Sequence, residues 1–162
     1  QVKLVRAMPN TPALIQIGAT GLYATAGVSE AEQQLAQQVM SAAGLVLWVD
    51  DEDLLHAVTA ISGSAPAYFF YMLENMIATG EKLGLTQTQA TALAMQTALG
   101  SAQMALTSHD TPAELRRKVT SPNGTTQAAI EVMDAKKMHQ IIADAMLACE
   151  QRSRELSQAF GK

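Results

Sequence analysis

The chain lacks the features that mark several classes of protein. It has a single cysteine, Cys149, which excludes an internal disulfide and fits a reducing compartment. No apolar run approaches the roughly 18 residues that cross a bilayer, and the N-terminus has no signal-peptide pattern. No basic run exceeds Arg116-Arg117-Lys118, and the net charge is −4, so nucleic acid is not an expected partner. Together these absences predict a soluble, cytoplasmic protein that binds neither membrane nor nucleic acid.

Metal-binding and triad patterns are also missing. The three histidines, His56, His109 and His139, lie far apart in the sequence, and none has a second His or Cys at a metal-ligand spacing. No metal site is therefore expected. Nothing places Ser, His and Asp as a catalytic triad, because His109-Asp110 precedes Thr111-Pro112 and is better interpreted as the loop that starts a helix.

The first 50 residues show a mixed α/β pattern. Residues 2–8, 19–24 and 45–49 are expected to be strands, and Ser29 with Glu32 forms a capping box at the start of a helix between the last two. The chain begins at Gln1 without a methionine and enters a strand at once. We therefore expect an upstream segment to precede it in the natural protein.

Strand signals stop at the acidic run from Asp50 to Asp53, and the pattern is helical from there to the end. A largely apolar helix over 66–83, closed by Gly84, is expected to be buried. The next helix, opened by Thr86, carries a stripe of small residues that suits tight packing within one chain or between two. The chain is thus predicted to be mainly α, with an α/β unit over 1–52 and an all-helical domain over 53–162.

A turn-rich loop, Ser121-Pro122-Asn123-Gly124-Thr125-Thr126, runs into another helical pattern. Pro122 ends what precedes it, Asn123 and Gly124 tolerate left-handed backbone angles, and Thr125 can cap the helix that follows. Free N–H groups and the helix dipole at such a start favour a carboxylate or a phosphate. An ordinary capped turn between two helices would use the same residues, so the loop alone leaves both interpretations open.

The longer segment around this loop resembles the signature of the pyrroline-5-carboxylate reductases. It runs from Pro112 to Asp134 and contains Val119-Thr120-Ser121-Pro122-Asn123-Gly124-Thr125-Thr126. Two further motifs are similar to those of the family, in the same order: Met8-Pro9-Asn10-Thr11-Pro12-Ala13 and Ser62-Gly63-Ser64-Ala65-Pro66-Ala67-Tyr68. The resemblance covers nearly the whole chain.

The resemblance implies an activity and a domain organisation. The family reduces the C=N bond of 1-pyrroline-5-carboxylate with NADPH or NADH, giving L-proline. Its members begin with a Rossmann domain, but Gly-x-Gly-x-x-Gly is absent here, so roughly the first hundred residues are expected to be missing. Residues 1–52 would then be the tail of that domain, and 53–162 the helical domain that dimerises. The fragment alone is expected to dimerise and to be inactive.

The resemblance also implies roles for individual residues. Thr126 would hydrogen-bond the ring nitrogen, while the N–H groups of Gly124, Thr125 and Thr126, with the Ser121 hydroxyl, would hold the substrate carboxylate. Glu52 would lie near the substrate amine, although it equally suits a solvated acidic linker. The missing N-terminal segment would bind most of the NADP or NAD, and within this chain the cofactor-binding residues would be Pro9, Asn10, Thr11, Gly63 and Pro66. Gly63 and Pro66 would also suit a plain turn between helices.

Several positions depart from the family pattern. Asn123 replaces the first glycine of Pro-Gly-Gly, and Ala65 replaces a glycine before Pro66. Lys118 stands where some members have an asparagine that touches the cofactor, so that role is not transferred. Lys136-Lys137 lies in place of Gly-Gly between the last two helices.

Two other classes are compatible with parts of the pattern. The helical domain of a β-hydroxyacid dehydrogenase also follows a Rossmann unit, but those enzymes pair a catalytic lysine with an asparagine one turn later, which is absent here. A helical dimerisation module without chemistry of its own would explain the small-residue stripe.

Overall fold

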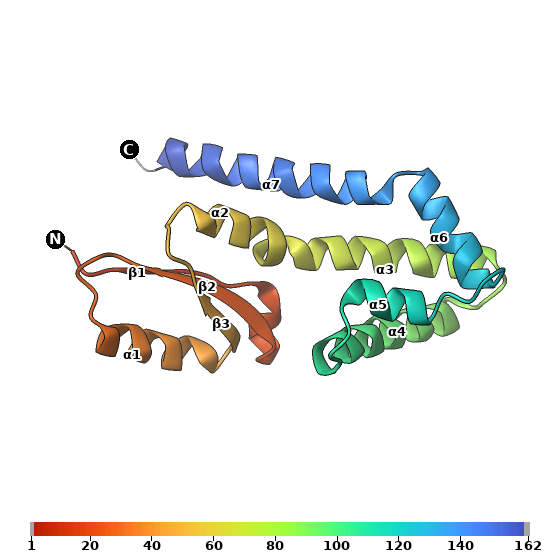
Figure 1. The fold of residues 1–162 in the computed structure, drawn as a ribbon, viewed down its shortest axis with the longest axis horizontal. Coiled ribbons are helices and arrows are strands. Elements are labelled where there is room, and N and C mark those ends of the chain that lie inside the picture. Colours follow the sequence, from red (N-terminus) through yellow and green to blue (C-terminus); the bar gives the residue numbers. More distant parts are fainter. Residues whose placement is uncertain (1, 161–162) are drawn as a thin grey trace. The chain divides into compact units, whose positions relative to one another are not determined.

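The computed structural model describes residues 2–160. They form two compact units, the first made of residues 1–68 and 143–162 and the second of residues 69–142 (Figure 1). The first unit holds every strand of the described chain, and the second is built of helices. This arrangement confirms the predicted fold class, a mainly α chain with a short α/β segment at its start.

The sheet has three strands in the order β1, β2, β3, which are Val5–Met8, Gly18–Ala24 and Gly44–Trp48. β1 runs antiparallel to β2, and β3 runs parallel to β2. A 3₁₀ helix, η1 (Thr11–Ile15), connects β1 to β2. Leu22, on the central strand, is fully buried. The core of this unit therefore lies around β2.

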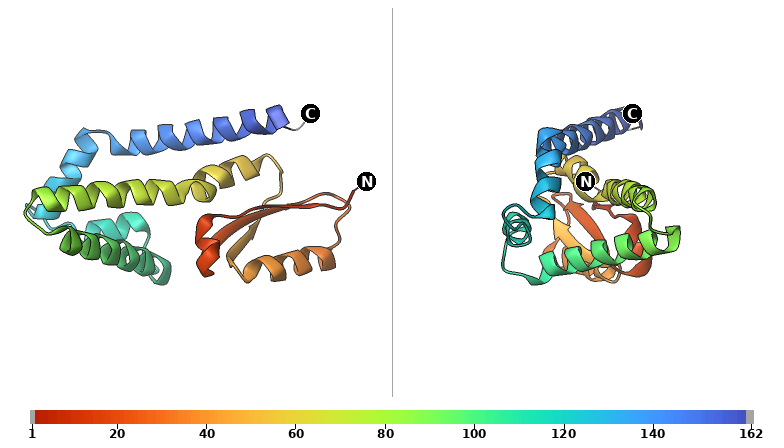
Figure 2. Two further views of the ribbon diagram at one scale, coloured as in Figure 1. Left: turned by 180° about the vertical axis from the view of Figure 1, so that it is seen from behind. Right: turned by 90° about the vertical axis from the view of Figure 1, so that its right-hand side faces the viewer.

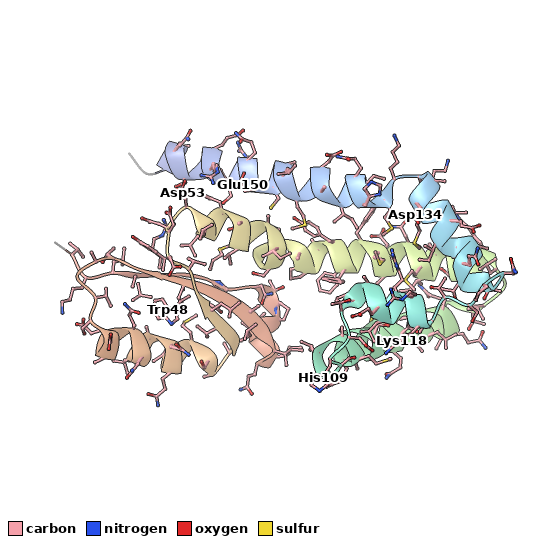
Figure 3. The ribbon with its side chains drawn as sticks, in the orientation of Figure 1. Trp48, Asp53, His109, Lys118, Asp134 and Glu150 are labelled. Atoms are coloured by element: carbon pink, nitrogen blue, oxygen red, sulfur yellow. The ribbon has the colours of Figure 1, made fainter. Side chains whose placement is uncertain are left out.

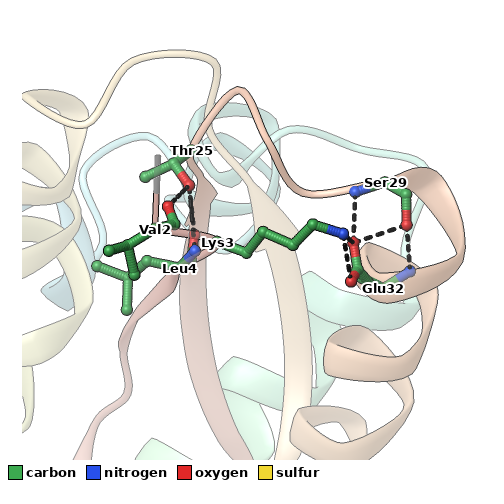
Figure 4. Close-up of polar contacts among 6 residues, drawn as sticks. All are labelled: Val2, Lys3, Leu4, Thr25, Ser29 and Glu32. Atoms are coloured by element: carbon green, nitrogen blue, oxygen red, sulfur yellow. Dashed lines mark hydrogen bonds and ion pairs between the residues drawn. The ribbon is translucent and has the colours of Figure 1, made fainter.

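Helix α1 (Glu30–Ser41) makes the crossover between the two parallel strands, and its start is fixed by polar contacts (Figure 4). Ser29 accepts from the Glu32 N–H, and Glu32 accepts from the Ser29 N–H at 2.8 Å, which forms the predicted capping box. Lys3 donates to the same carboxylate at 2.8 Å. Hydrogen bonds from Lys3 and Ser29 lower the pKa of Glu32 from 4.5 to about 2.

A continuous helical stretch follows the sheet. It comprises α2 (Leu54–Val58), a π-helical turn η2 (Thr59–Gly63) and α3 (Ala65–Lys82). The π turn is closed by the Ser64 N–H, which donates to the Thr59 carbonyl five residues earlier at 2.8 Å. Within the first unit, α1 lies on one side of the sheet and α2 on the other (Figures 1 and 2). Residues around the π turn are thereby held next to β2.

The second half of α7 (Met138–Phe160) lies along α2 in the first unit. The His56 Nδ1 and Ser153 Oγ atoms are 2.8 Å apart, and Arg154 binds both Asp53, at 2.8 Å, and Glu150. Figure 3 labels these two carboxylates. The hydrogen bond from Arg154 lowers the pKa of Asp53 below its ordinary value. Polar contacts therefore fasten α7 to the beginning of α2.

The second unit contains most of α3, then α4 (Gln87–Thr107), α5 (Pro112–Lys118) and α6 (Thr125–Ala135). Gly84 ends the α3 segment with φ 101°, as expected. Thr86 and Thr111 each cap a helix through a capping box, with Gln89 and Glu114 respectively. The start of each of these helices is therefore determined locally.

The second unit buries very little of its apolar surface. Among its described residues only Ala90 and Ala94, both on α4, are buried. The expectation that α3 is buried is wrong for the isolated chain, because Phe69 is 66% exposed and Met72 and Met76 are also exposed. A helical unit of this size with so small a core does not reach the usual stability of a domain.

Two further findings concern classes of site. No helix among residues 2–160 is long and apolar enough to cross a membrane. In the same residues, no group of three or more His, Cys, Asp or Glu side chains is arranged to hold a metal ion.

Candidate active site

The loop from Ser121 to Gly124 is a tight turn between α5 and α6. Asn123 has φ 58°, in the left-handed region that asparagine tolerates better than most residues. The Gly124 N–H donates to the Ser121 carbonyl at 3.0 Å, and a Cβ on Gly124 would lie 3.0 Å from that same oxygen. Glycine at 124 therefore permits the close approach that turns the chain into α6.

The start of α6 differs from the prediction by one residue. Gly124, not Thr125, is the N-cap, and no side chain caps it. The Gln127 carboxamide instead accepts from the Asn123 N–H at 2.7 Å. The expected cap by Thr125 is therefore wrong, because the helix already includes Thr125 as its first residue.

This geometry determines which donors remain for a ligand. The first helical hydrogen bond of α6 is made by the Ala128 N–H to the Gly124 carbonyl at 3.2 Å. The N–H groups of Thr125, Thr126 and Gln127 precede it and have no partner one turn earlier. The Gly124 N–H is already used within the loop, so it is a weaker candidate than expected.

The hydroxyl groups of the loop are differently exposed. Ser121 and Thr125 are exposed, whereas Thr126 is half-buried. Among the described residues, no hydrogen bond of the Thr126 hydroxyl is found, so this group is available to a ligand. The helix dipole and the free N–H groups of the first turn favour an anion beside it.

Two arginines lie next to the loop. A cleft of about 290 Å³ between α5 and α6 is lined by Arg116, Arg117 and Thr120, together with Ala113 and Ile130. Lys118, which is labelled in Figure 3, is paired with Asp110, and Arg117 is paired with Glu114 at 3.9 Å. The guanidinium groups that line the cleft, one of them already paired, were not assigned to the site by sequence reasoning.

The three residues expected at a strand end lie directly after β1. Pro9 and Thr11 are exposed, and Asn10 is half-buried. The Asn10 carboxamide accepts from the Ala19 N–H at 2.9 Å and donates to the Ser62 carbonyl at 3.2 Å. The structure thus brings this segment together with the turn that contains Gly63.

The Ser62-Gly63-Ser64 turn is packed closely. A Cβ on Gly63 would lie 2.6 Å from the Met8 Cε atom, so the tip of the Met8 side chain packs directly against this glycine. Pro66 lies in the first turn of α3, where a proline is tolerated. On the far side of the turn, Cys149 Sγ lies 3.2 Å from Ser64 Oγ.

Glu52 forms an ion pair with Arg6 of β1. Both side chains are 46% exposed, so the pair is of the weakly stabilising surface type. Its acidic neighbours have other partners, because Asp51 accepts from the Asp53 N–H and Asp53 pairs with Arg154. Sequence reasoning missed Arg6, because it lies 46 residues before Glu52 in the chain.

The predicted site residues fall into two groups. Pro9, Asn10, Thr11, Glu52, Gly63 and Pro66 belong to the first unit, while Ser121, Gly124, Thr125 and Thr126 belong to the second. Within the first group, the contacts of Asn10 join the segment after β1 to the turn.

Comparisons with known proteins place this architecture in a class and a family. The model of the pyrroline-5-carboxylate reductase dimerisation family matches residues 52–156. The reductase of Pseudomonas aeruginosa is 55% identical over 98% of this chain and 58% of that protein, and the one from Haemophilus influenzae is 45% identical over 97% and 58%. The chain therefore spans about 58% of the length of these relatives.

Solved structures of the same family are also similar to this chain. A pyrroline-5-carboxylate reductase from Coxiella burnetii is 44% identical, with a TM-score of 0.92 over 95% of this chain and 57% of that one. The Plasmodium falciparum pyrroline carboxylate reductase, solved with NADP bound, is 27% identical, with a TM-score of 0.89 over 94% and 60%.

The fold and these matches define the class, an α/β segment followed by a helical dimerisation domain. Because the family model covers most of the chain, the chain belongs to the pyrroline-5-carboxylate reductase family.

Proposed function

We propose that the protein containing this chain reduces 1-pyrroline-5-carboxylate to L-proline with NADPH or NADH. The observation that carries the proposal is the start of α6, where free backbone N–H groups and the unpaired Thr126 hydroxyl occur together in the family's signature. The reaction needs a held carboxylate, an oriented imine carbon and a hydrogen-bond partner for the ring nitrogen.

The substrate carboxylate is assigned to the loop. The N–H groups of Thr125 and Thr126 are the donors at the positive end of the α6 dipole, and the exposed Ser121 hydroxyl adds a third. Gly124 contributes by permitting the turn rather than by donating, because its N–H bonds Ser121. Arg116 and Arg117 add favourable charge in the neighbouring cleft.

Thr126 is assigned to the ring nitrogen. The residue is half-buried, and no described residue makes a hydrogen bond with its hydroxyl. A threonine hydroxyl is too weak an acid to protonate an amine at neutral pH, so its role is to orient the ring, and the proton comes from water or from the iminium form of the substrate.

Within this chain, the first unit is assigned to the nicotinamide end of the cofactor, most of which would be bound by the missing N-terminal segment. A bound reduced nicotinamide would supply the hydride that converts the C=N bond to CH–NH. Exposed Pro9 and Thr11 follow β1, and the close-packed turn at Gly63 offers backbone to a planar ring. Glu52, held by Arg6, is assigned to the substrate amine, with its charge available on the exposed side.

The partner is proposed to be a second copy of this chain. The family match over 52–156 describes a dimerisation domain, and the second unit leaves apolar surface open along α3 and α4. A groove of about 450 Å³ between these helices is lined mainly by apolar side chains, among them Phe70, Leu73, Ile77 and Met95. Burying these faces in a homodimer would supply the core that one copy lacks. The free thiol of Cys149 fits the reducing cytoplasm, which we propose as the location.

The test is substrate selectivity of the intact natural protein. We expect oxidation of NADPH or NADH that depends on 1-pyrroline-5-carboxylate and yields proline. The ring without its carboxylate, 1-pyrroline, should be reduced with kcat/KM at least about a hundredfold lower, because the anion donors stay unpaired. Equal rates on both rings would contradict the carboxylate site. A stable dimer that reduces neither would favour the non-catalytic dimerisation module.

A further inference from the structure

The Ser62 carbonyl has an unusual position in the π-helical turn. In a regular helix it would accept from the N–H four residues later, but residue 66 is a proline and has none. The next N–H, on Ala67, donates to the Ser64 carbonyl at 3.0 Å. The turn therefore leaves Ser62 without a helical donor, and a partly buried carbonyl in that state requires another partner.

Asn10 supplies that partner. Its Nδ2 atom donates to the Ser62 carbonyl at 3.2 Å, while its Oδ1 atom accepts from the Ala19 N–H at 2.9 Å. Both hydrogen bonds are partly buried, and both join backbone to one planar carboxamide. The end of β1, the start of β2 and the π turn are thus tied together through a single side chain.

Few other residue types could make this connection. The link needs a donor and an acceptor on one short, planar group. Aspartate offers only acceptors when ionised and would place an oxygen against the Ser62 carbonyl. The Met8 side chain packs against Gly63 from the same strand end, so the turn and the end of β1 are neighbours there.

We propose that Asn10 is a positioning residue: its carboxamide fixes the Ser62-Gly63-Ser64 turn in the place that the reaction requires, rather than binding the cofactor itself. The catalytic part of this inference rests on the proposed function, in which the turn faces the nicotinamide. We call the two hydrogen bonds of the Asn10 carboxamide, to Ser62 and Ala19, the clamp. The evidence for the clamp is these two hydrogen bonds and the proline at 66.

Two variants and one control test the clamp in the intact natural protein. Asn10→Ala removes both hydrogen bonds, and Asn10→Asp keeps the acceptor for Ala19 while removing the donor to Ser62. Asn75→Asp is the matched control, because the exposed Asn75 carboxamide also donates to a backbone carbonyl, that of Tyr71 at 2.7 Å. If Asn10→Ala is too unstable to purify, Asn10→Asp still isolates the donor.

Amide hydrogen exchange tests the clamp independently of enzyme activity. We expect the amides at 63–65 to exchange at least about tenfold faster in Asn10→Asp than in the unmodified protein, with no change in Asn75→Asp. Unchanged exchange at these amides in Asn10→Asp would overturn the clamp. This arm gives an answer even if the protein reduces no imino acid, so it separates failure of the clamp from failure of the proposed function.

Steady-state kinetics and NADPH binding test whether the clamp matters for the reaction. We expect kcat of Asn10→Asp to fall at least about tenfold, because a small misplacement at a reacting centre is costly. The dissociation constant for NADPH should stay within about twofold, since the carboxamide does not bind it. Weakened NADPH binding with normal exchange would instead assign Asn10 to the cofactor and overturn the proposal. Faster exchange with unchanged kcat would overturn its catalytic part.

Discussion

Replacing Ala98 by aspartate tests whether the small-residue face of α4 is buried by a second copy. Ala98 follows the buried Ala90 and Ala94 along the same helical stripe, but it is exposed in the single chain. Aspartate at a solvent-exposed position of a helix costs at most about 0.7 kcal/mol in propensity. At an apolar interface, the same carboxylate would lose its water and find no partner.

The expected loss of dimer stability can be worked out from the free energy of protonating the buried carboxyl group. A desolvated aspartate at pH 7 can protonate, which costs about 4 kcal/mol from an ordinary pKa near 3.9, and partial hydration reduces this to about 2. A twofold dimer carries the substitution twice, so the total is about 4–8 kcal/mol. The dimer dissociation constant should therefore rise at least about a thousandfold.

Sedimentation velocity over a dilution series of the intact protein measures this constant. Ala92→Asp is the control, because Ala92 is exposed on the opposite side of the same helix. We expect Ala98→Asp to dissociate at concentrations where Ala92→Asp and the unmodified protein remain dimeric. Equal dissociation constants for the two variants would refute the assignment of this face to the dimer.

Three further predictions concern stability. The unmodified protein should be more stable to unfolding than Glu32→Gln above pH 4.5, and this difference should disappear as the pH falls towards 2. The reason is that the pKa of Glu32 is lowered to about 2 in the folded chain. Thermal melts at several pH values measure the difference, and a difference that does not change with pH would contradict the prediction. Gly44→Ala should destabilise by at least about 3 kcal/mol in denaturant titration, since Gly44 has φ 137° and a Cβ would lie 2.1 Å from the Gly18 carbonyl oxygen. Lys137→Gly should raise Tm by about 1–3 °C, because Lys137 has φ 54°, and a lower Tm would show that its backbone is not strained.

Features that depend on neighbouring residues were predicted correctly from the sequence. The capping boxes at Ser29 and Thr86 and the left-handed end at Gly84 were predictable, because each depends on residues within one helical turn. The strands were also placed correctly, although β1 begins at Val5 rather than residue 2. Its pairing partners on β2 end at Ala24, opposite Val5.

Contacts between distant segments were not predictable from local pattern. Asn10 meets Ser62, 52 residues later, and Arg6 meets Glu52, 46 residues later. The π turn was missed because the pattern of apolar residues does not distinguish a single five-residue helical turn from a regular one. The burial of α3 was expected from its apolar residues, but such a pattern does not reveal whether the covering surface belongs to the same copy or to another.

In the candidate site, too, some features were predictable from the local sequence and others were not. Turn chemistry placed Asn123 at a left-handed angle and α6 directly after it, whereas the exact cap depended on the Gln127 carboxamide. The roles of Thr126 and Glu52 came from resemblance to the family and remain predictions.

The most direct test of the central claim is the kinetics of Thr126→Ala in the intact natural protein. Thr107→Ala serves as the control, because its exposed hydroxyl bonds only the Gln103 carbonyl within α4. We predict that Thr126→Ala lowers kcat/KM for 1-pyrroline-5-carboxylate by about tenfold or more, a loss of at least ~1.4 kcal/mol of transition-state stabilisation, while Thr107→Ala changes it little. Unchanged kinetics in Thr126→Ala would contradict the assignment of the imino acid to this loop.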